Sequence, residues 1–174
     1  MSKRLSYVLR HRPESVGLTL DEAGWVPVDE LLAALDRAGL PLTREQLDVV
    51  VVTNDKRRFA YDDAGGRIRA SQGHSVPVEL GYAPSQPPPV LFHGTVDRSV
   101  CSVLTEGLHA GRRHAVHLSC DVGTARAVGA RRGRPVVLRV DAAAMAAEGA
   151  VFTRSANGVW LTDAVPARHL AVAG

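Results

Sequence analysis

The sequence has few cysteines, few aromatic residues and no long apolar run, and each shortage excludes a class of protein. Its 174 residues include two cysteines, Cys101 and Cys120, and no CxxC pair, which is too few for a disulfide-stabilised secreted scaffold. Aromatic residues make up 5% of the chain, which argues against a stacking platform for single-stranded nucleic acid. No uncharged run reaches transmembrane length, and residues 1–14 lack the apolar core of a signal peptide. We therefore expect a reduced, cytoplasmic protein.

Common nucleotide-binding motifs and a large excess of charge are also absent. The sequence contains neither the GxxxxGK[ST] P-loop nor the GxGxxG motif, so a bound nucleotide would need another kind of site. It has no GxSxG motif, and no pair of carboxylates stands out as an acid–base couple. The 21 Lys and Arg against 18 Asp and Glu give a net charge of +3, which permits an RNA or nucleotide partner without demanding one. Hydrophobic residues, at 45%, are sufficient for a packed core.

A proline-rich stretch marks the clearest boundary in the chain. Residues 81–90, GYAPSQPPPV, contain four prolines beside glycine and serine, a composition typical of an extended linker. We therefore predict a first domain over residues 1–82, a linker over residues 83–89 and a second domain over residues 90–174.

The first half predicts three helices followed by a hairpin, which is the order of a winged-helix domain. The first two helices are expected over residues 3–11 and within 27–40, each with an apolar face. The third begins after Thr43, which forms a capping-box pattern with Gln46. The apolar run 49–52 is either the buried end of that helix or a strand, because β-branched residues weaken a helix. Residues 56–71, KRRFAYDDAGGRIRAS, predict two strand arms around a DDAGG turn.

The second half mixes short strands with helices, which predicts an α+β fold. Helices are expected over residues 98–106, 121–132 and 142–149, and strands over residues 114–119 and 134–141. The segment LFHGT, residues 91–95, is expected to end an apolar run in a polar turn. One or two final strands are expected within residues 157–173.

Histidine and arginine are the residue types left to carry chemistry. Most of the seven histidines lie in short polar turns at the ends of apolar runs, where scaffolds present functional groups. Arg10 and His11 end the first predicted helix, where they either compensate the helix dipole or bind phosphate. Further arginines occur at 57–58, at 67 and 69, and at 112–113. These are either solvated surface residues or a convergent cluster whose guanidinium forks match phosphate oxygens. A site rich in Arg and His but poor in carboxylates suits phosphate chemistry.

No metal site is predicted. The candidate zinc ligands are Cys101, His114, His117 and Cys120. His114 and His117 lie three residues apart on a predicted strand and therefore point to opposite faces. The spacing of the set also differs from that of known zinc sites.

Six segments occur in one order along the chain: LSYVLRHRPE, GWVPVDELL, NDKRRFAYDDAGGRIRASQGHS, LFHGT, EGLHAGRRHAVHLS and NGVWLTDAVP. Together, from Leu5 to Pro166, they resemble the RNA 2′-phosphotransferases, also called tRNA 2′-phosphotransferases. The resemblance implies a winged-helix lobe that binds RNA and phosphate, followed by an NAD-binding lobe of the ADP-ribosyltransferase fold.

The resemblance also implies a two-step reaction without a metal. The 2′-phosphate of an RNA, of the kind left at a tRNA splice junction, attacks C1″ of the nicotinamide ribose of NAD⁺, and nicotinamide leaves. The ribose O2″ of the ADP-ribosylated RNA then attacks phosphorus. The products are RNA with a free 2′-hydroxyl and ADP-ribose 1″,2″-cyclic phosphate.

Site residues follow from the family's motifs, residue by residue. The resemblance implies a catalytic quartet that grips the transferred phosphate: Arg10, His11, Arg58 and Arg113. Counting back from the HLS motif selects Arg113 rather than Arg112. Two motifs are implied to face NAD⁺: His93, Gly94 and Thr95, and His117, Leu118 and Ser119. A third is implied to lie near the substrate phosphate and NAD⁺: Gln72, Gly73, His74 and Ser75. Asn157, in the NGVWL motif, is implied to be mainly structural with contacts to the site.

The chain departs from the family pattern near Arg113. Ala115 stands where the family commonly has histidine, and Ala110 and Gly111 stand where it often has Pro-Met. Neither departure touches the quartet, and the positions concerned bear on the local loop shape and on the affinity for NAD⁺.

Two other classes of protein share parts of this pattern. A winged-helix nucleic-acid binder without enzymatic activity explains the first half but not the HGT and HLS motifs. An ADP-ribosyltransferase that modifies nucleic-acid phosphate ends, or protein, shares the NAD site and the first step only. A complete quartet favours the second step, because only that step needs so much positive charge on one phosphate. We expect a monomer that acts on NAD⁺ and RNA bearing a 2′-phosphate, with no membrane partner.

Overall fold

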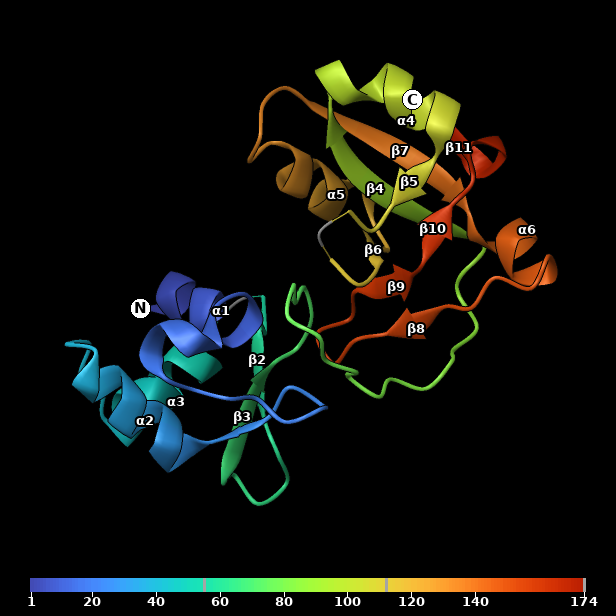
Figure 1. Ribbon diagram of the computed structural model, residues 1–174. Helices are drawn as coiled ribbons and strands as arrows, with labels where there is room; N and C mark the ends of the chain where they lie inside the picture. The colour runs from blue at the N-terminus through green and yellow to red at the C-terminus, as the bar shows by residue number, and fades with distance from the viewer. Residues whose placement is uncertain (55, 112, 174) are drawn as a thin grey trace. The chain divides into compact units, whose positions relative to one another are not determined.

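The computed structural model describes residues 1–54, 56–111 and 113–173, and it divides the chain into two compact units, Met1–Gly81 and Tyr82–Gly174 (Figure 1). Helices alternate with small antiparallel sheets of two or three strands. This arrangement confirms the α+β class. The roles predicted for the two domains stay predictions.

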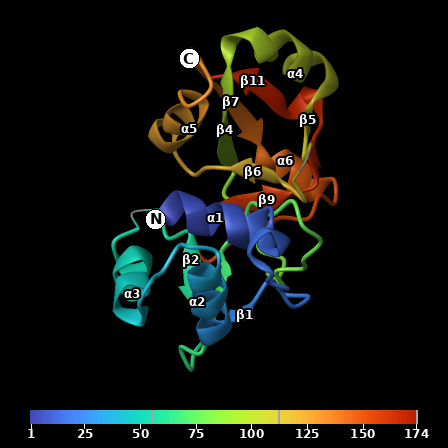
Figure 2. The same cartoon turned by 60° about the vertical axis from the view of Figure 1, so that its left-hand side comes forward.

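The first unit contains three α-helices, a short 3₁₀ helix and a three-stranded sheet in the described ranges. In chain order they are α1 (Ser2–Arg10), η1 (Pro13–Val16), β1 (Val26–Pro27), α2 (Val28–Arg37), α3 (Arg44–Val52), β2 (Phe59–Tyr61) and β3 (Arg67–Ala70). Figure 2 shows α1, α2 and α3 gathered around β2. The predicted helices and hairpin are therefore confirmed, and the sequence order missed the short strand β1, which pairs with β3, and the 3₁₀ helix η1.

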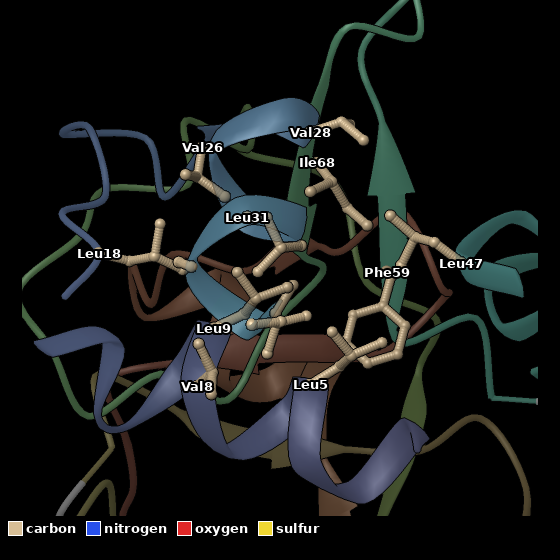
Figure 3. Close-up of a cluster of buried hydrophobic side chains, with 13 residues drawn as sticks. Leu5, Val8, Leu9, Leu18, Val26, Val28, Leu31, Leu47, Phe59 and Ile68 are labelled. Carbon is tan, nitrogen blue, oxygen red and sulfur yellow. The ribbon is translucent and has the colours of Figure 1, made fainter. Parts of the chain in front are cut away.

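One apolar core holds the first unit together (Figure 3). Helix α1 contributes Leu5, Val8 and Leu9, whose spacing puts them on one helical face. They pack with Leu31 of α2 and Ile68 of β3 in the same cluster. Each such side chain, when fully buried, contributes about 1.5–3 kcal/mol to folding. The opposite face of α1 is thereby left to polar residues, including Arg10 at the helix end.

The apolar run at residues 49–52 belongs to a helix, but its side chains are not all buried. Thr43 and Gln46 form the predicted capping box, which begins α3. Only Leu47 of α3 is fully covered, whereas the side chains of Val49 and Val52 are 59% and 82% exposed. The prediction of a buried run was therefore wrong, because a helix turns successive valines to different faces and only one face of α3 meets the core.

The second unit has the following elements: β4 (Val90–Val96), η2 (Asp97–Ser99), α4 (Val100–Glu106), β5 (Leu108–His109), β6 (Val116–Leu118), α5 (Val122–Gly129), β7 (Pro135–Asp141), α6 (Ala142–Ala147), β8 (Thr153–Arg154), β9 (Trp160–Thr162), β10 (Ala164–Val165), η3 (Ala167–His169) and β11 (Leu170–Val172). β7 pairs with β4 on one side and β11 on the other, and β9 lies between β6 and β8. A second apolar core includes Leu91, Met145 and Phe152.

The HGT motif lies inside a strand, so the prediction of a polar turn at residues 93–95 was wrong. All seven residues of β4 pair with β7, with His93 opposite Leu138 and Gly94 opposite Val137. Gly94 is not a turn residue. It lets α5 approach the strand, because a Cβ at this position would lie 1.7 Å from the carbonyl oxygen of Ala125.

Short strands account for further differences from the sequence analysis in the second unit, and the helix expected over residues 121–132 ends at Gly129. Three strands, β9, β10 and β11, lie within residues 157–173 rather than one or two. Two-residue strands such as β5, β8 and β10 are too short to carry a period of alternation. The proline-rich segment also pairs: Pro84 bridges Thr153, and the Ser85 amide donates to the Phe152 carbonyl at 2.8 Å. It is therefore part of the second unit rather than a free linker.

None of the helices in the described part of the chain has the length and apolarity needed to cross a bilayer.

Candidate active site

In the first unit, the end of α1 is tied to the segment that carries Gln72, Gly73, His74 and Ser75. The Ser75 amide donates to the Arg10 carbonyl at 2.9 Å, which satisfies one of the open carbonyls at the helix end. The Ser75 hydroxyl lies 2.9 Å from Nδ1 of His11. Ser75 is thus held against Arg10 and His11, although more than 60 residues separate it from them in the sequence.

The other residues of that segment have mainly structural surroundings. Gly73 has a φ of 86°, in the left-handed region that favours glycine. His74 is only 3% exposed and lies beside Gly24. Gln72 is half-buried, and Ser75 is exposed. Ser75 is therefore the member of this motif that both contacts His11 and remains open to a ligand.

Arg58 belongs to the same group in the first unit. Its carbonyl accepts from the Ser71 amide at 2.8 Å and from Nη2 of Arg10 at 3.5 Å, the outer limit of hydrogen bonding. Its guanidinium Nη1 donates to Oδ1 of Asn54 at 3.3 Å. The preceding residue, Arg57, has a φ of 40°, an uncommon conformation for a residue with a side chain. The chain thus turns sharply immediately before Arg58.

Asn54 is a residue of this site that the sequence analysis missed. Its side chain is largely buried, and its Oδ1 also accepts from the Lys56 amide at 3.2 Å. Its Nδ2 donates to the Ser2 hydroxyl at 2.8 Å, which anchors it to the start of α1. Asn54 therefore fixes the direction of the Arg58 guanidinium. The NDKRRF segment contained a sequence signal for this role, because an asparagine four residues before a candidate arginine can orient the guanidinium.

Two arginines of the hairpin serve the fold of the first unit instead. Arg67 pairs with Asp62 at 3.0 Å and Asp21 at 3.5 Å. Arg69 donates to the carbonyls of Ala23 and Leu80 and lies 4.4 Å from the centre of the Trp25 ring. The prediction of a convergent arginine cluster therefore does not extend to these two residues.

In the second unit, a pocket of about 380 Å³ brings together residues of two predicted motifs. Its described lining residues are His93, Leu108, His109, Ala110, Gly111, Arg113, Ala115, Val116, His117 and Arg132. None of these described residues is a carboxylate, so the wall offers cations and imidazoles. The volume lies in the range that holds small ligands. The family departures at Ala110, Gly111 and Ala115 all fall on this wall.

His93 is held in one protonation state. Its Nδ1 lies 3.0 Å from the His117 carbonyl, and because a carbonyl only accepts, Nδ1 carries the proton. Burial lowers the pKa of His93, and the positive charges of Arg113 and Arg132 lower it further, while the bond to the His117 carbonyl acts in the opposite direction. The ring is therefore neutral at pH 7, with Nε2 as a hydrogen-bond acceptor.

Arg113 and Arg132 give the pocket its charge. The pKa of Arg113 is lowered, first by desolvation and then by repulsion from Arg132 and Arg131. A guanidinium nevertheless stays charged at any physiological pH. Arg112, the neighbour weighed against Arg113 in the sequence, lies outside the described residues.

The remaining predicted residues of the second unit are mainly structural. The Leu118 side chain is fully buried in the core and offers a ligand only its main chain. The main chain of Ser119 exchanges two hydrogen bonds with Phe92, at 2.8 and 2.9 Å, which holds β6 beside β4. Thr95 faces α5 through its carbonyl, close to Gly129. Asn157 lies in the β8–β9 turn, where its Oδ1 accepts from the Ser155 hydroxyl at 2.7 Å.

The cysteines and other histidines form no ion site in the ranges that the structure describes. Cys101 and Cys120 are free and exposed. His169 is buried and lies 3.1 Å from a carboxylate oxygen of Glu148. No group of three or more His, Cys, Asp or Glu side chains in residues 1–54, 56–111 and 113–173 is arranged to hold a metal.

Fold and chemistry together define an α+β protein that carries cations and imidazoles suited to a phosphorylated ligand. The chain belongs to the family described as RNA 2′-phosphotransferase, Tpt1/KptA family, which matches residues 1–164. A probable RNA 2′-phosphotransferase of Streptomyces coelicolor is 59% identical over 170 residues, covering 98% of this chain and 92% of that protein. Proteins of the same name from Agrobacterium fabrum and Escherichia coli are 56% and 50% identical, covering 98% and 97% of this chain and 92% of each relative.

Proposed function

We propose that this protein removes an internal 2′-monophosphate from RNA by transferring it to NAD⁺. Membership of the RNA 2′-phosphotransferase family supports the RNA substrate and the transferred group. The observation that carries the NAD⁺ part is the second-unit pocket, where a neutral His93 lies in a wall containing Arg113 and Arg132. In this proposal the first unit acts as a winged-helix lobe for RNA. The second acts as an ADP-ribosyltransferase-like lobe, in a cytoplasmic enzyme of the tRNA-splicing type.

The first step needs a site that holds a dinucleotide ribose and its phosphates. A 2′-phosphate oxygen of the RNA bonds to C1″ of the nicotinamide ribose, and the bond from C1″ to the nicotinamide nitrogen breaks. The electron pair leaves with nicotinamide and neutralises its ring charge. The His93 Nε2 accepts a hydrogen bond from a ribose hydroxyl, while Arg113 offers charge to phosphate oxygens.

The second step concentrates negative charge on one phosphorus. The ribose O2″ gives up its proton and bonds to phosphorus, and the bond from phosphorus to the RNA O2′ breaks. The RNA oxygen takes up a proton, and ADP-ribose 1″,2″-cyclic phosphate is released. The residues proposed for this step are the four that the family motifs imply: Arg10, His11, Arg58 and Arg113. The arginines neutralise the developing charge. His11 contacts the phosphate or donates a proton beside it.

The neutral state of His93 predicts how NAD⁺ binding depends on pH. An ordinary histidine is half-protonated near pH 6.5, and the pKa of His93 is lowered from that value. We therefore expect the affinity for NAD⁺, measured by calorimetry without RNA, to weaken at a lower pH than the titration of an ordinary histidine would give, as Nε2 gains a proton. His93→Gln should bind weakly across the whole range and slow both steps. An affinity whose fall has its midpoint at or above about pH 6.5 would contradict the assignment.

The contact between Asn54 and Arg58 predicts a selective defect in the second step. Asn54→Ala removes the acceptor that directs Arg58, so we expect phosphate transfer to slow roughly tenfold while ADP-ribosylation of RNA is retained. Ser2→Ala is the matched control, because it removes the hydrogen bond that Nδ2 of Asn54 donates without touching Arg58. Single-turnover assays of each step give the measurement. In an Arg58→Ala background, Asn54→Ala should add no further loss. An additive loss would mean that Asn54 acts independently of Arg58.

An NAD⁺-dependence assay tests the proposed function. The protein is mixed with an RNA oligonucleotide that carries one internal 2′-phosphate, with and without NAD⁺, and RNA and nicotinamide are quantified. We expect loss of the phosphate only with NAD⁺, with one nicotinamide released per phosphate removed. A stable ADP-ribose adduct on the RNA would instead indicate an ADP-ribosyltransferase of nucleic-acid ends. Binding of RNA without any reaction would indicate a non-enzymatic winged-helix binder.

A further inference from the structure

The turn after α5 carries an arginine that no sequence motif singled out. Residues 130–134, ARRGR, follow α5 and lead into β7. As a sequence, this turn resembles an ordinary solvated helix end. In the structure, Arg132 lines the second-unit pocket together with Arg113, His93 and His117.

Backbone packing fixes the position of Arg132 relative to the HGT strand. Gly129, the last residue of α5, is pressed against β4, because a Cβ there would lie 2.5 Å from the Thr95 carbonyl oxygen. The Arg132 amide donates to the Gly129 carbonyl at 3.0 Å. The Arg134 carbonyl accepts from the Asp97 amide at 3.1 Å, at the end of β4. The turn is thus fastened on both sides of Arg132.

The charge around Arg132 is uncompensated among the described residues. No described carboxylate lies within ion-pair distance of Arg113, Arg131 or Arg132. This differs from Arg44, Arg67 and Arg168, each of which pairs with an acid. Repulsion among like charges held close together is relieved by an anion. Two guanidinium forks in one pocket wall match the several oxygens of a phosphoryl group.

We propose that Arg132 is a further phosphate-binding residue of this pocket, which shares the phosphoryl oxygens of the bound ligand with Arg113. The inference rests on the proposed function, in which phosphate reaches the pocket from two sources. One is the pyrophosphate of NAD⁺, and the other is the 2′-phosphate in transfer. Arg132 has the same chemical role with either source. The KM for NAD⁺ and the rate of the second step distinguish the two sources.

The test compares Arg132→Gln, Arg132→Lys and the unmodified full-length protein, with Arg126→Gln as the matched control. Arg126 is an exposed arginine of α5 that does not line the pocket, so its substitution removes the same charge elsewhere on the unit. The KM for NAD⁺ is measured at saturating 2′-phosphorylated RNA. Single-turnover rates of the two steps are measured at saturating NAD⁺. Arg126→Gln should match the unmodified protein in every constant.

A pyrophosphate contact predicts that Arg132→Gln raises the KM for NAD⁺ about tenfold with the second step unchanged. A contact to the transferred phosphate predicts an unchanged KM for NAD⁺, with the second step slowed about tenfold and the ADP-ribosylated RNA accumulating. In either case the affected constant of Arg132→Lys should lie between that of the unmodified protein and that of Arg132→Gln. If Arg132→Gln matches the unmodified protein within about twofold in all constants, Arg132 is a solvated surface residue and the inference is wrong. If the unmodified protein shows no NAD⁺-dependent reaction, the proposed function fails, and this inference fails with it.

Discussion

Arg113→Ala is expected to arrest the reaction after its first step. The variant should still join ADP-ribose to the RNA 2′-phosphate but should release ADP-ribose 1″,2″-cyclic phosphate roughly 10²–10³-fold more slowly, which is typical when one group that stabilises transition-state charge is removed. The physical reason is charge. Arg113 lines the pocket without a described acidic partner. Its guanidinium is therefore available to the phosphate on which the second step concentrates negative charge.

The measurement for Arg113→Ala is a time course that resolves substrate RNA, ADP-ribosylated RNA and product RNA. Arg134→Ala serves as a control, because Arg134 is an exposed arginine of the same unit that does not line the pocket. It should follow the unmodified time course. His11→Ala is expected to accumulate the same intermediate as Arg113→Ala. Release of cyclic phosphate by Arg113→Ala at the unmodified rate would remove Arg113 from the quartet.

Gly94→Ala is expected to unfold the second unit rather than to impair one chemical step. The added Cβ would lie 1.7 Å from the Ala125 carbonyl oxygen and 2.9 Å from the Gly129 amide nitrogen. Both neighbours are backbone atoms of α5, so they cannot move aside as a flexible side chain can. The helix must leave β4, and the turn that carries Arg132 leaves with it. We expect a loss of more than about 3 kcal/mol in the free energy of unfolding.

Thermal and urea unfolding, followed by circular dichroism, measure the effect of Gly94→Ala. Gly66→Ala is the matched control, because a Cβ at Gly66 meets no atom within 4 Å and its backbone lies outside the left-handed region. It should unfold at the same urea concentration as the unmodified chain. A Gly94→Ala protein with normal stability but weakened NAD⁺ binding would show that Gly94 serves the ligand rather than the packing.

Elements with a strong local signal were predictable from the sequence. The capping box at Thr43, the apolar face of α1 and the alternation around the DDAGG turn each produced the expected element. Elements fixed by distant partners were not. Nothing local in LFHGT distinguishes a turn from a strand, and pairing with β7 decides the outcome. Val49 and Val52 are exposed because no element among the described residues of the first unit covers that face of α3.

The candidate site shows the same division between local signals and tertiary structure. Family motifs selected His11, His93 and Arg113, and the structure adds which atoms hold them, such as Ser75 Oγ for His11 and the His117 carbonyl for His93. The sequence did not predict Asn54 or Arg132. Asn54 is identified by its hydrogen bond to Arg58, and Arg132 by its place in the pocket wall. For Leu118 the structure adds that the side chain belongs to the core, which leaves only its main chain to a ligand.

The mass of the phosphorus-containing product tests the central claim most directly. RNA with a single ³²P-labelled internal 2′-phosphate is incubated with the protein and NAD⁺, and the released label is separated and identified by mass. The account predicts that all released label appears as ADP-ribose 1″,2″-cyclic phosphate, with the RNA left as a 2′-hydroxyl. Label released as inorganic phosphate, at a rate independent of NAD⁺, would contradict it and would identify a hydrolytic phosphatase.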